Sequence, residues 1–141
     1  MGGRTVKIIA DTNILVRAIA DDDKIQSPIA KAQLDEAELV AVTLPALCEF
    51  CWVFLSAYKA SREDIAAAIR KLISASNVKV DAQAVEAGLA FLEEGGDFAD
   101  GVIAHDGQWL GGETFVSFDR GAVGLLTKHG QPALDPDRSK A

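Results

Sequence analysis

Two aspartates each come directly after a short apolar segment rich in β-branched residues. Asp11 follows Val6–Ala10, and Asp119 follows Thr114–Phe118. In open parallel sheets, ligands bind at the carboxyl ends of the strands, so we expect both carboxylates at one edge of a sheet. Each aspartate also precedes an expected helix, and Asp is a favoured helix N-cap. Capping therefore explains either residue alone equally well.

A second pair of aspartates shares one face of an expected helix. Asp97 and Asp100 stand three residues apart, which makes their side chains neighbours on the helix surface. An N-cap role accounts for Asp97 well. It accounts for Asp100 less well, because Phe98, Val102 and Ile103 indicate that this first turn lies close to the core.

Glu49 is the most informative acid, because it lies inside the apolar segment LPALCEFCWVFL. The residues one helical turn away on either side are all apolar: Pro45, Ala46, Trp52 and Val53. A carboxylate in such a wall is costly unless a cation or several donors meet it. A salt bridge to a distant Lys or Arg is the structural alternative, although buried ion pairs seldom add stability.

Carboxylates that converge on one sheet edge would repel one another without a cation. Hard oxygen ligands with room for water suit Mg²⁺ or Mn²⁺. Such a cluster can activate water and stabilise the leaving oxygen during hydrolysis of a phosphodiester. The acids therefore predict metal-dependent hydrolytic chemistry.

The bulk properties fit one enzyme domain. The chain has 141 residues and a net charge of −7, so we expect a single domain over residues 1–141, with a core of about 6–134 and a loose C-terminal tail. The acidity argues against a generic nucleic-acid binder but allows an enzyme that meets phosphate through metal ions. The short apolar runs predict no signal peptide and no membrane span, which favours a cytoplasmic protein.

The hydrophobic pattern alternates between strands and helices. The expected strands are Val6–Ala10, Leu39–Val42, Val78–Val80, Thr114–Phe118 and a weak one near Gln131–Leu134. The expected helices are Asn13–Ala20, a helix capped by Ser27 and running to about Glu36, Pro45–Tyr58, Ser61–Ile73, Asp81–Glu94, Asp97–His105 and Gly121–Lys128. This order predicts an α/β fold with a mainly parallel sheet covered on both faces.

Four segments together resemble the PIN-domain nucleases, and most closely the VapC-type toxin ribonucleases of type II toxin–antitoxin pairs. The segments are ADTNILVRAI, PALCEFCWVF, GGDFADGVIAH and FVSFDRGA, and the similarity runs from about Val6 to Leu134. The resemblance implies a three-layer α/β/α sandwich, usually dimeric. It also implies an endoribonuclease dependent on Mg²⁺ or Mn²⁺ that cleaves RNA and is neutralised by a small antitoxin.

The resemblance also implies roles for individual residues. The family's four acids, in chain order, correspond to Asp11, Glu49, Asp100 and Asp119, which are then the catalytic and metal-binding residues. Asp97 matches an extra acid of the DFAD form of the motif, either as a further metal ligand or only as a helix cap. Asn13 and Ser117 match polar neighbours that help to hold the carboxylates and water.

The acidic cleft and the net charge predict the chemistry of the antitoxin. Because antitoxins of the resembled family often lay a segment across the toxin's groove, we expect the C-terminal part of this one to insert an Arg or Lys near the four acids, in competition with metal and RNA. The apolar flank of the groove is expected from the helices around Leu44–Leu55 and Ser27–Glu36.

Two other functions are compatible with parts of the sequence. A Mg²⁺-dependent phosphatase of the haloacid dehalogenase type would use Asp11 as nucleophile, but that motif needs a second Asp two residues later, where Asn13 stands. A non-catalytic binding module on the same scaffold would not need intact acids. His105 and His129 are expected to be structural or exposed rather than catalytic.

Overall fold

The computed structural model describes residues 6–137 and residue 139. Contacts within the chain divide it into two compact units, Met1–Asp81 and Ala82–Ala141, which we describe separately. Of the tail expected to be loose, residues 138, 140 and 141 lie outside the described part. The assignment of residues 1–141 to one domain stays a prediction.

The first unit is built on a parallel three-stranded sheet with the order β1-β2-β3. Its register places Ile8 opposite Val40, and Val40 in turn opposite Val78. The central residue Val40 is fully buried, as expected for a strand covered on both faces. The strands are β1 (Lys7–Ile9), β2 (Leu39–Ala41) and β3 (Val78–Lys79).

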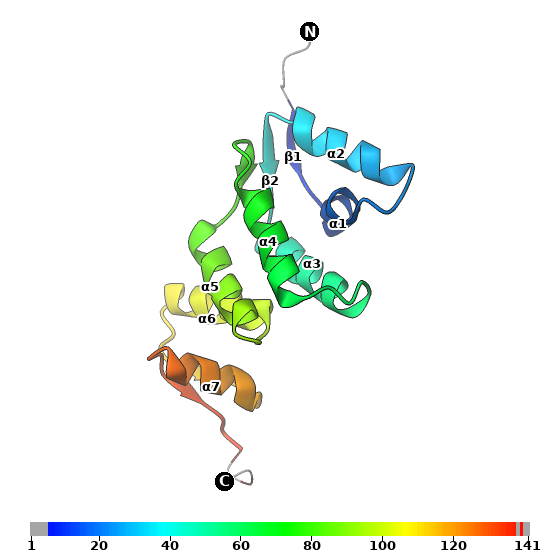
Figure 1. The fold of residues 1–141 in the computed structure, drawn as a ribbon. Helices are drawn as coiled ribbons and strands as arrows, with labels where there is room; N and C mark the ends of the chain where they lie inside the picture. Colours follow the sequence, from blue (N-terminus) through cyan, green and yellow to red (C-terminus); the bar gives the residue numbers. More distant parts are fainter. Residues whose placement is uncertain (1–5, 138, 140–141) are drawn as a thin grey trace. The chain divides into compact units, whose positions relative to one another are not determined.

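Four helices accompany this sheet and connect its strands in the parallel sense (Figure 1). They are α1 (Thr12–Ala20), α2 (Gln26–Glu36), α3 (Leu44–Ser56) and α4 (Arg62–Ile73). The fully buried side chains Leu15, Leu47, Phe50, Ile65 and Ile69 form much of the core of this unit. The helices thus bury their apolar faces and leave the start of α1 and one face of α3 accessible.

The start of α2 differs from the sequence prediction. Ser27 is not the N-cap: the helix begins at Gln26, and Ser27 is completely buried, where its hydroxyl accepts from the Asp23 N–H at 3.2 Å. The N-cap is Ile25, whose side chain makes no capping bond. The carboxylate of Asp23 accepts from the N–H groups of Ile25 and Gln26 at 2.9 and 2.7 Å and so shapes the turn into the helix. These bonds hold the pKa of Asp23 below its ordinary value.

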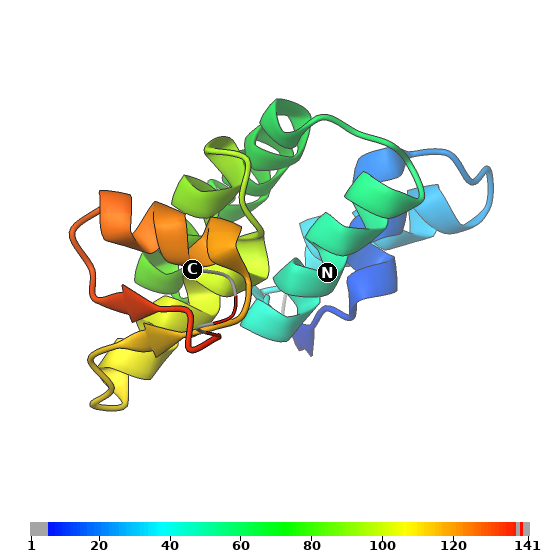
Figure 2. The same ribbon diagram turned by 90° about the horizontal axis from the view of Figure 1, so that it is seen from below.

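The second unit contains three helices and a two-stranded parallel sheet, β4-β5. The two strands lie side by side as the orange and red arrows of Figure 2. Its apolar cluster comprises Phe91, Ala104, Ala122 and Leu126. The elements are α5 (Ala82–Glu93), α6 (Phe98–Trp109), β4 (Phe115–Val116), α7 (Arg120–Lys128) and β5 (Ala133–Leu134).

Helices α5 and α6 approach each other so closely that two glycines are required. A Cβ at Gly101 would lie 2.4 Å from the carbonyl oxygen of Ala87, and one at Gly88 would lie 2.6 Å from the Phe98 ring. Real Cβ atoms do not tolerate such distances, so any larger residue would push the helices apart. Gly101 therefore holds the first turn of α6, including the neighbouring Asp100, against α5.

Helix α6 is one turn longer than expected. The sequence predicts an end near His105, but the helix continues to Trp109, and the N–H of Leu110 bonds to the Asp106 carbonyl at 3.0 Å. The chain leaves the helix through Gly111, whose φ of 104° favours glycine. The glycine in the added turn, Gly107, did not stop the helix, because a single Gly costs a helix only about 1 kcal/mol relative to Ala.

The α/β fold with parallel strands is confirmed. Each predicted strand and helix has a counterpart, and every strand pairing in the described residues is parallel. The strands fall into two sheets. Within residues 6–137, no helix has the length and apolar character needed to cross a membrane.

Candidate active site

Asp11 is an N-cap that keeps one carboxylate oxygen available. Its backbone is extended at the start of α1, and Oδ1 accepts from the N–H of Thr12 at 2.8 Å. Oδ2 accepts no hydrogen bond from the residues that the structure describes. The capping and ligand explanations of this residue are thus compatible, because each uses a different oxygen.

Glu49 is exposed, so the expectation of a buried acid in an apolar wall is wrong. Helix α3 turns Leu47, Phe50 and Cys51 inward, whereas Glu49 lies on the accessible side with Trp52, which is 69% exposed. Of the apolar residues one turn from Glu49, Ala46 is buried, whereas Pro45 and Trp52 are exposed. The expected structural alternative is also absent, since Glu49 forms no ion pair within the described part of the chain.

Thr12 connects the two acids of the first unit and is a residue that sequence reasoning missed. Its hydroxyl lies 3.2 Å from Oε1 of Glu49 and 3.4 Å from the carbonyl oxygen of Ala46. Thr12 thus ties the first residue of α1 to α3 and orients Glu49. The only sequence signal was a hydroxyl side chain directly after Asp11.

Asp11, Asn13 and Glu49 line one cavity of about 470 Å³. This volume is within the usual range for ligand sites. The cavity extends along α1 and α3 beyond the acids, and its full lining is Asp11, Thr12, Asn13, Val16, Arg17, Glu49, Val53, Ala57 and Tyr58. The structure therefore brings together three of the predicted site residues in the first unit.

Two aspartates of the second unit also act as N-caps. Oδ1 of Asp97 accepts from the N–H of Ala99 at 3.1 Å at the start of α6. Oδ1 of Asp119 accepts from the N–H groups of Gly121 and Ala122 at 2.9 and 3.2 Å at the start of α7. Among residues 6–137 neither Oδ2 atom has a hydrogen-bond donor, so each carboxylate again keeps one oxygen for another partner.

Asp100 differs from the other acids because its charge is not compensated. It is half-buried, and within the described residues no donor meets its carboxylate. Burial raises the pKa of Asp100, and the negative charges of Asp97 and Asp119 raise it further. Asp97 and Asp119 therefore lie near enough to Asp100 to disfavour its ionised form.

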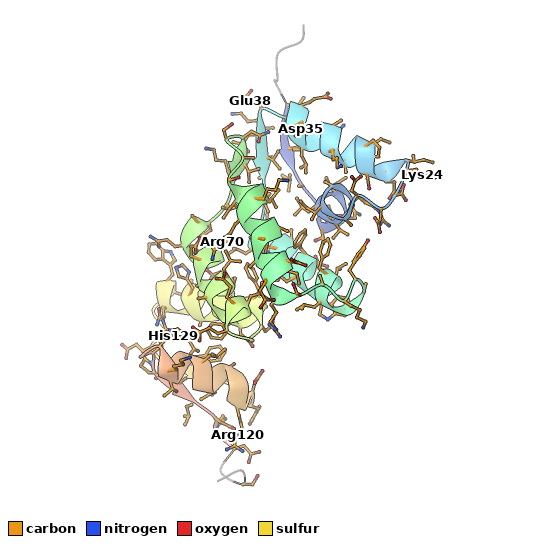
Figure 3. All side chains as sticks on the ribbon, in the orientation of Figure 1. Lys24, Asp35, Glu38, Arg70, Arg120 and His129 are labelled. Carbon is orange, nitrogen blue, oxygen red and sulfur yellow. The ribbon has the colours of Figure 1, made fainter. Side chains whose placement is uncertain are left out.

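Ser117 and the histidines have other roles than contact with these carboxylates. The Ser117 hydroxyl accepts from the backbone N–H of Asp119 at 3.0 Å, which shapes the turn between β4 and α7. His129 caps the other end of α7, opposite Arg120 (Figure 3), and lies 2.9 Å from a carboxylate oxygen of Glu94. This position separates His129 from Asp119, in agreement with the expected structural role.

The profile of the PIN domain matches residues 8–123. The chain belongs to the PIN-domain family. PIN domains are typically metal-dependent nucleases that use a divalent metal. No curated protein and no solved structure matches the chain.

Each unit of this PIN domain carries oxygens that suit a hard divalent cation. In the first unit, Asp11 keeps an oxygen beyond the one used in capping. In the second, Asp97 and Asp119 each keep one such oxygen and Asp100 keeps both. All of these donors are carboxylate oxygens, which Mg²⁺ and Mn²⁺ prefer over nitrogen or sulfur. No group of three such ligands within residues 6–137 already has the spacing of a formed metal site.

Proposed function

We propose that this PIN-domain protein is an endoribonuclease dependent on Mg²⁺ or Mn²⁺. The observation that carries the proposal is Asp100, a half-buried carboxylate that two other acids disfavour and that no described donor offsets. A protein retains such a group at a cost, and a bound cation would remove that cost. RNA is the substrate class that the resemblance to VapC-type toxins supports.

In this proposal Asp11, Glu49, Asp100 and Asp119 hold the metal, with Asp97 as a further ligand or only a cap. A divalent metal supplies a nucleophilic water at neutral pH and neutralises charge on the phosphate oxygens. The chain's own residues orient the ligands: Thr12 holds Glu49 at 3.2 Å, and Ser117 fixes the backbone of Asp119 at 3.0 Å. Asn13, in the cavity with Asp11 and Glu49, is proposed to hold water.

Metal-dependent RNA cleavage is the direct test. Wild-type protein should cleave single-stranded RNA with Mg²⁺ or Mn²⁺, should lose this activity in EDTA, and should not turn over p-nitrophenyl phosphate. Hydrolysis of p-nitrophenyl phosphate alone would favour the phosphatase alternative. Binding of RNA without cleavage under any metal would favour the non-catalytic module.

Calorimetric titration of Mn²⁺ tests the ligand assignment. Asp11→Asn and Asp100→Asn should each weaken Mn²⁺ binding by about tenfold or more. Asp106→Asn is the matched control, because Asp106 lies on α6 like Asp100 but contacts His105 at 3.4 Å. Wild-type affinity in both test variants would refute the assignment.

We further propose that the protein acts in the cytoplasm as the toxin of a toxin–antitoxin pair and forms a homodimer. A small antitoxin would insert an Arg or Lys near the acids, as the bidentate pairing of Arg with carboxylates and the net charge of −7 suggest. Exposed Ile25, Ile29 and Trp52 on or beside α2 and α3 support an apolar flank for this partner.

Co-expression tests the toxin role. Expression of the chain alone should arrest growth, and the protein encoded by an adjacent short reading frame should relieve the arrest and suppress RNA cleavage. Replacing the inserted basic residue of that partner should restore much of the cleavage while apolar contacts keep the complex together. A complex that leaves the acids fully accessible would contradict this mode of inhibition.

Sedimentation analysis of the isolated chain tests the homodimer.

A further inference from the structure

The cavity beside Asp11 and Glu49 contains a basic residue that the proposed metal chemistry does not use. Arg17 is the one basic side chain among the described residues that line it. Asn13 and Arg17 stand one turn apart on α1, so about 6 Å of helix separates their backbones. The cavity thus joins acids at the start of α1 to a cation in the middle of the helix.

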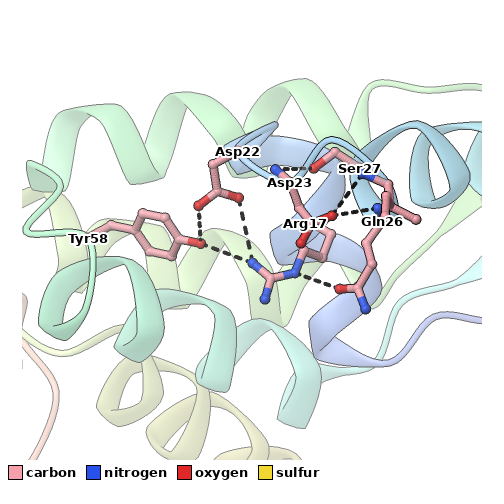
Figure 4. Close-up of polar contacts among 7 residues, drawn as sticks. Arg17, Asp22, Asp23, Gln26, Ser27 and Tyr58 are labelled. Carbon is pink, nitrogen blue, oxygen red and sulfur yellow. Dashed lines mark hydrogen bonds and ion pairs between the residues drawn. The ribbon is translucent and has the colours of Figure 1, made fainter.

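The Arg17 guanidinium is held in one orientation, but not all of its N–H donors have a hydrogen-bond partner in the described part of the chain. Its Nε donates to Oε1 of Gln26 at 2.9 Å, which fixes the plane of the group (Figure 4). Nη1 has only long contacts, 3.5 Å to the Tyr58 hydroxyl and 3.6 Å to Oδ1 of Asp22. Nη2 has no hydrogen-bond partner in the described part of the chain, and the side chain is 37% exposed.

The carboxylate of Asp22 already lies beside Tyr58 and Arg17. Its Oδ2 accepts from the Tyr58 hydroxyl at 2.9 Å, while its Oδ1 remains 3.6 Å from Arg17 (Figure 4). Asp22 also raises the pKa of Tyr58, chiefly through this hydrogen bond, so the phenol stays a donor. Arg17 and Tyr58 can therefore both donate to one anion. The Asp22 carboxylate forms a short hydrogen bond only with the Tyr58 hydroxyl.

A phosphate is the anion that fits these donors best. The guanidinium fork binds phosphate through two parallel hydrogen bonds, and Arg is the usual residue for this purpose. In a chain of net charge −7, a cation within the cavity also offsets repulsion of the RNA backbone.

We propose that Arg17 is a substrate-binding residue that holds an RNA phosphate next to the one being cleaved, and that Asp22 competes with this phosphate. The inference rests on the proposed ribonuclease function and specifies how its substrate is held. The alternative is purely structural: Arg17, Asp22 and Tyr58 would only tie the loop after α1 to the end of α3. The two explanations differ in what substitutions do to RNA affinity and its salt dependence.

The test measures KM for cleavage, and binding of a short fluorescein-labelled single-stranded RNA of mixed sequence, at salt concentrations from about 50 to 200 mM. Arg17→Gln should raise KM about three- to tenfold with little change in kcat, because a charge-assisted contact is lost. The slope of log affinity against log salt should fall by about 0.7, the value for one phosphate contact on a single strand. Lys31→Gln is the matched control, because Lys31 pairs with Asp21 at 2.7 Å and does not line the cavity.

Asp22→Asn provides a second variant with an effect of opposite sign. Removing the competing carboxylate should tighten RNA binding about twofold, a typical effect of one exposed charge. Asp21→Asn makes the same charge change at the adjacent residue, whose carboxylate pairs with Lys31 at 2.7 Å, and should leave the affinity close to that of the wild type. Arg17→Lys should keep the salt slope but bind RNA more weakly, because an ammonium group cannot form the fork.

The outcomes separate this inference from the proposed function. Cleavage of RNA by the wild type, with unchanged KM and salt slope in Arg17→Gln, overturns the inference alone. Weaker RNA binding in Asp22→Asn also overturns it, since a structural tether would give that result. If the wild type neither binds nor cleaves RNA, the proposed function and the inference both fail.

Discussion

The two units hold their acidic residues in physically different ways. In the first unit Glu49 is exposed and accepts a hydroxyl hydrogen bond from Thr12, and Asp11 caps a helix, so solvent and donors offset both charges. In the second unit Asp100 is half-buried beside Asp97 and Asp119 and meets no donor within residues 6–137. Asp11 and Glu49 therefore cost the folded protein little stability, whereas Asp100 lowers the stability of the metal-free protein.

Asp100→Asn should have the largest effect and tests the comparison most directly. RNA cleavage should fall by about 100-fold or more, because the residue is assigned to the metal and acts together with the other acids. The metal-free variant should nevertheless be at least as stable as the wild type, because the substitution removes an uncompensated charge. Urea unfolding in EDTA measures the stability, and a clear loss would mean that Asp100 has an unrecognised structural partner.

Gly101→Ala tests how the second unit positions Asp100. The added methyl group would meet the Ala87 carbonyl at 2.4 Å, so we expect a loss of about 1–3 kcal/mol and a parallel loss of cleavage. Gly107→Ala is the matched control on the same helix, where nothing lies within 4 Å of the new Cβ. That control should gain about 0.5–1 kcal/mol from higher helix propensity. Equal stabilities for the two variants would contradict the close packing of α5 and α6.

The raised pKa of Asp100 predicts how the stability of the metal-free protein depends on pH. The folded state binds a proton on Asp100 more readily than the unfolded chain, whose ordinary pKa is 3.8. The resulting stabilisation is fully present below pH 3.8 and is lost as pH rises through the higher folded-state pKa. Thermal unfolding of the wild type and Asp100→Asn should therefore differ most at neutral pH and converge toward pH 4.

Glu49→Gln should have the smallest effect on stability, within about 0.5 kcal/mol of the wild type. Glu49 is exposed and its Oε1 contact with Thr12 can be kept by the amide oxygen of Gln, so little is lost on folding. RNA cleavage should still fall strongly, because the amide cannot replace a carboxylate ligand. Destabilisation by more than about 2 kcal/mol would instead indicate a buried or paired Glu49.

Much of the secondary structure could be predicted from the sequence because its signals are local. Caps such as Asp97 and Asp119, and the change from β-branched runs to helical spacing, located every strand and helix to within a few residues. One error arose where tertiary contacts outweighed a local signal, because Ser27 is buried rather than capping α2. Another arose from a local signal that was overvalued: α6 continues past Gly107 to Trp109, since a single Gly costs a helix only about 1 kcal/mol.

For the candidate site, too, some features depend on the sequence alone and others on the tertiary structure. The sequence by itself determined which acids occur, their order and the family to which they point, because these depend only on residue types and spacing. Only the tertiary structure decided that Glu49 is accessible while Asp100 is half-buried, and that Thr12 and Arg17 share a cavity with Asp11. The physical reason is that burial and hydrogen bonding depend on which side of a helix faces its neighbours, and residues distant in the sequence supply those neighbours.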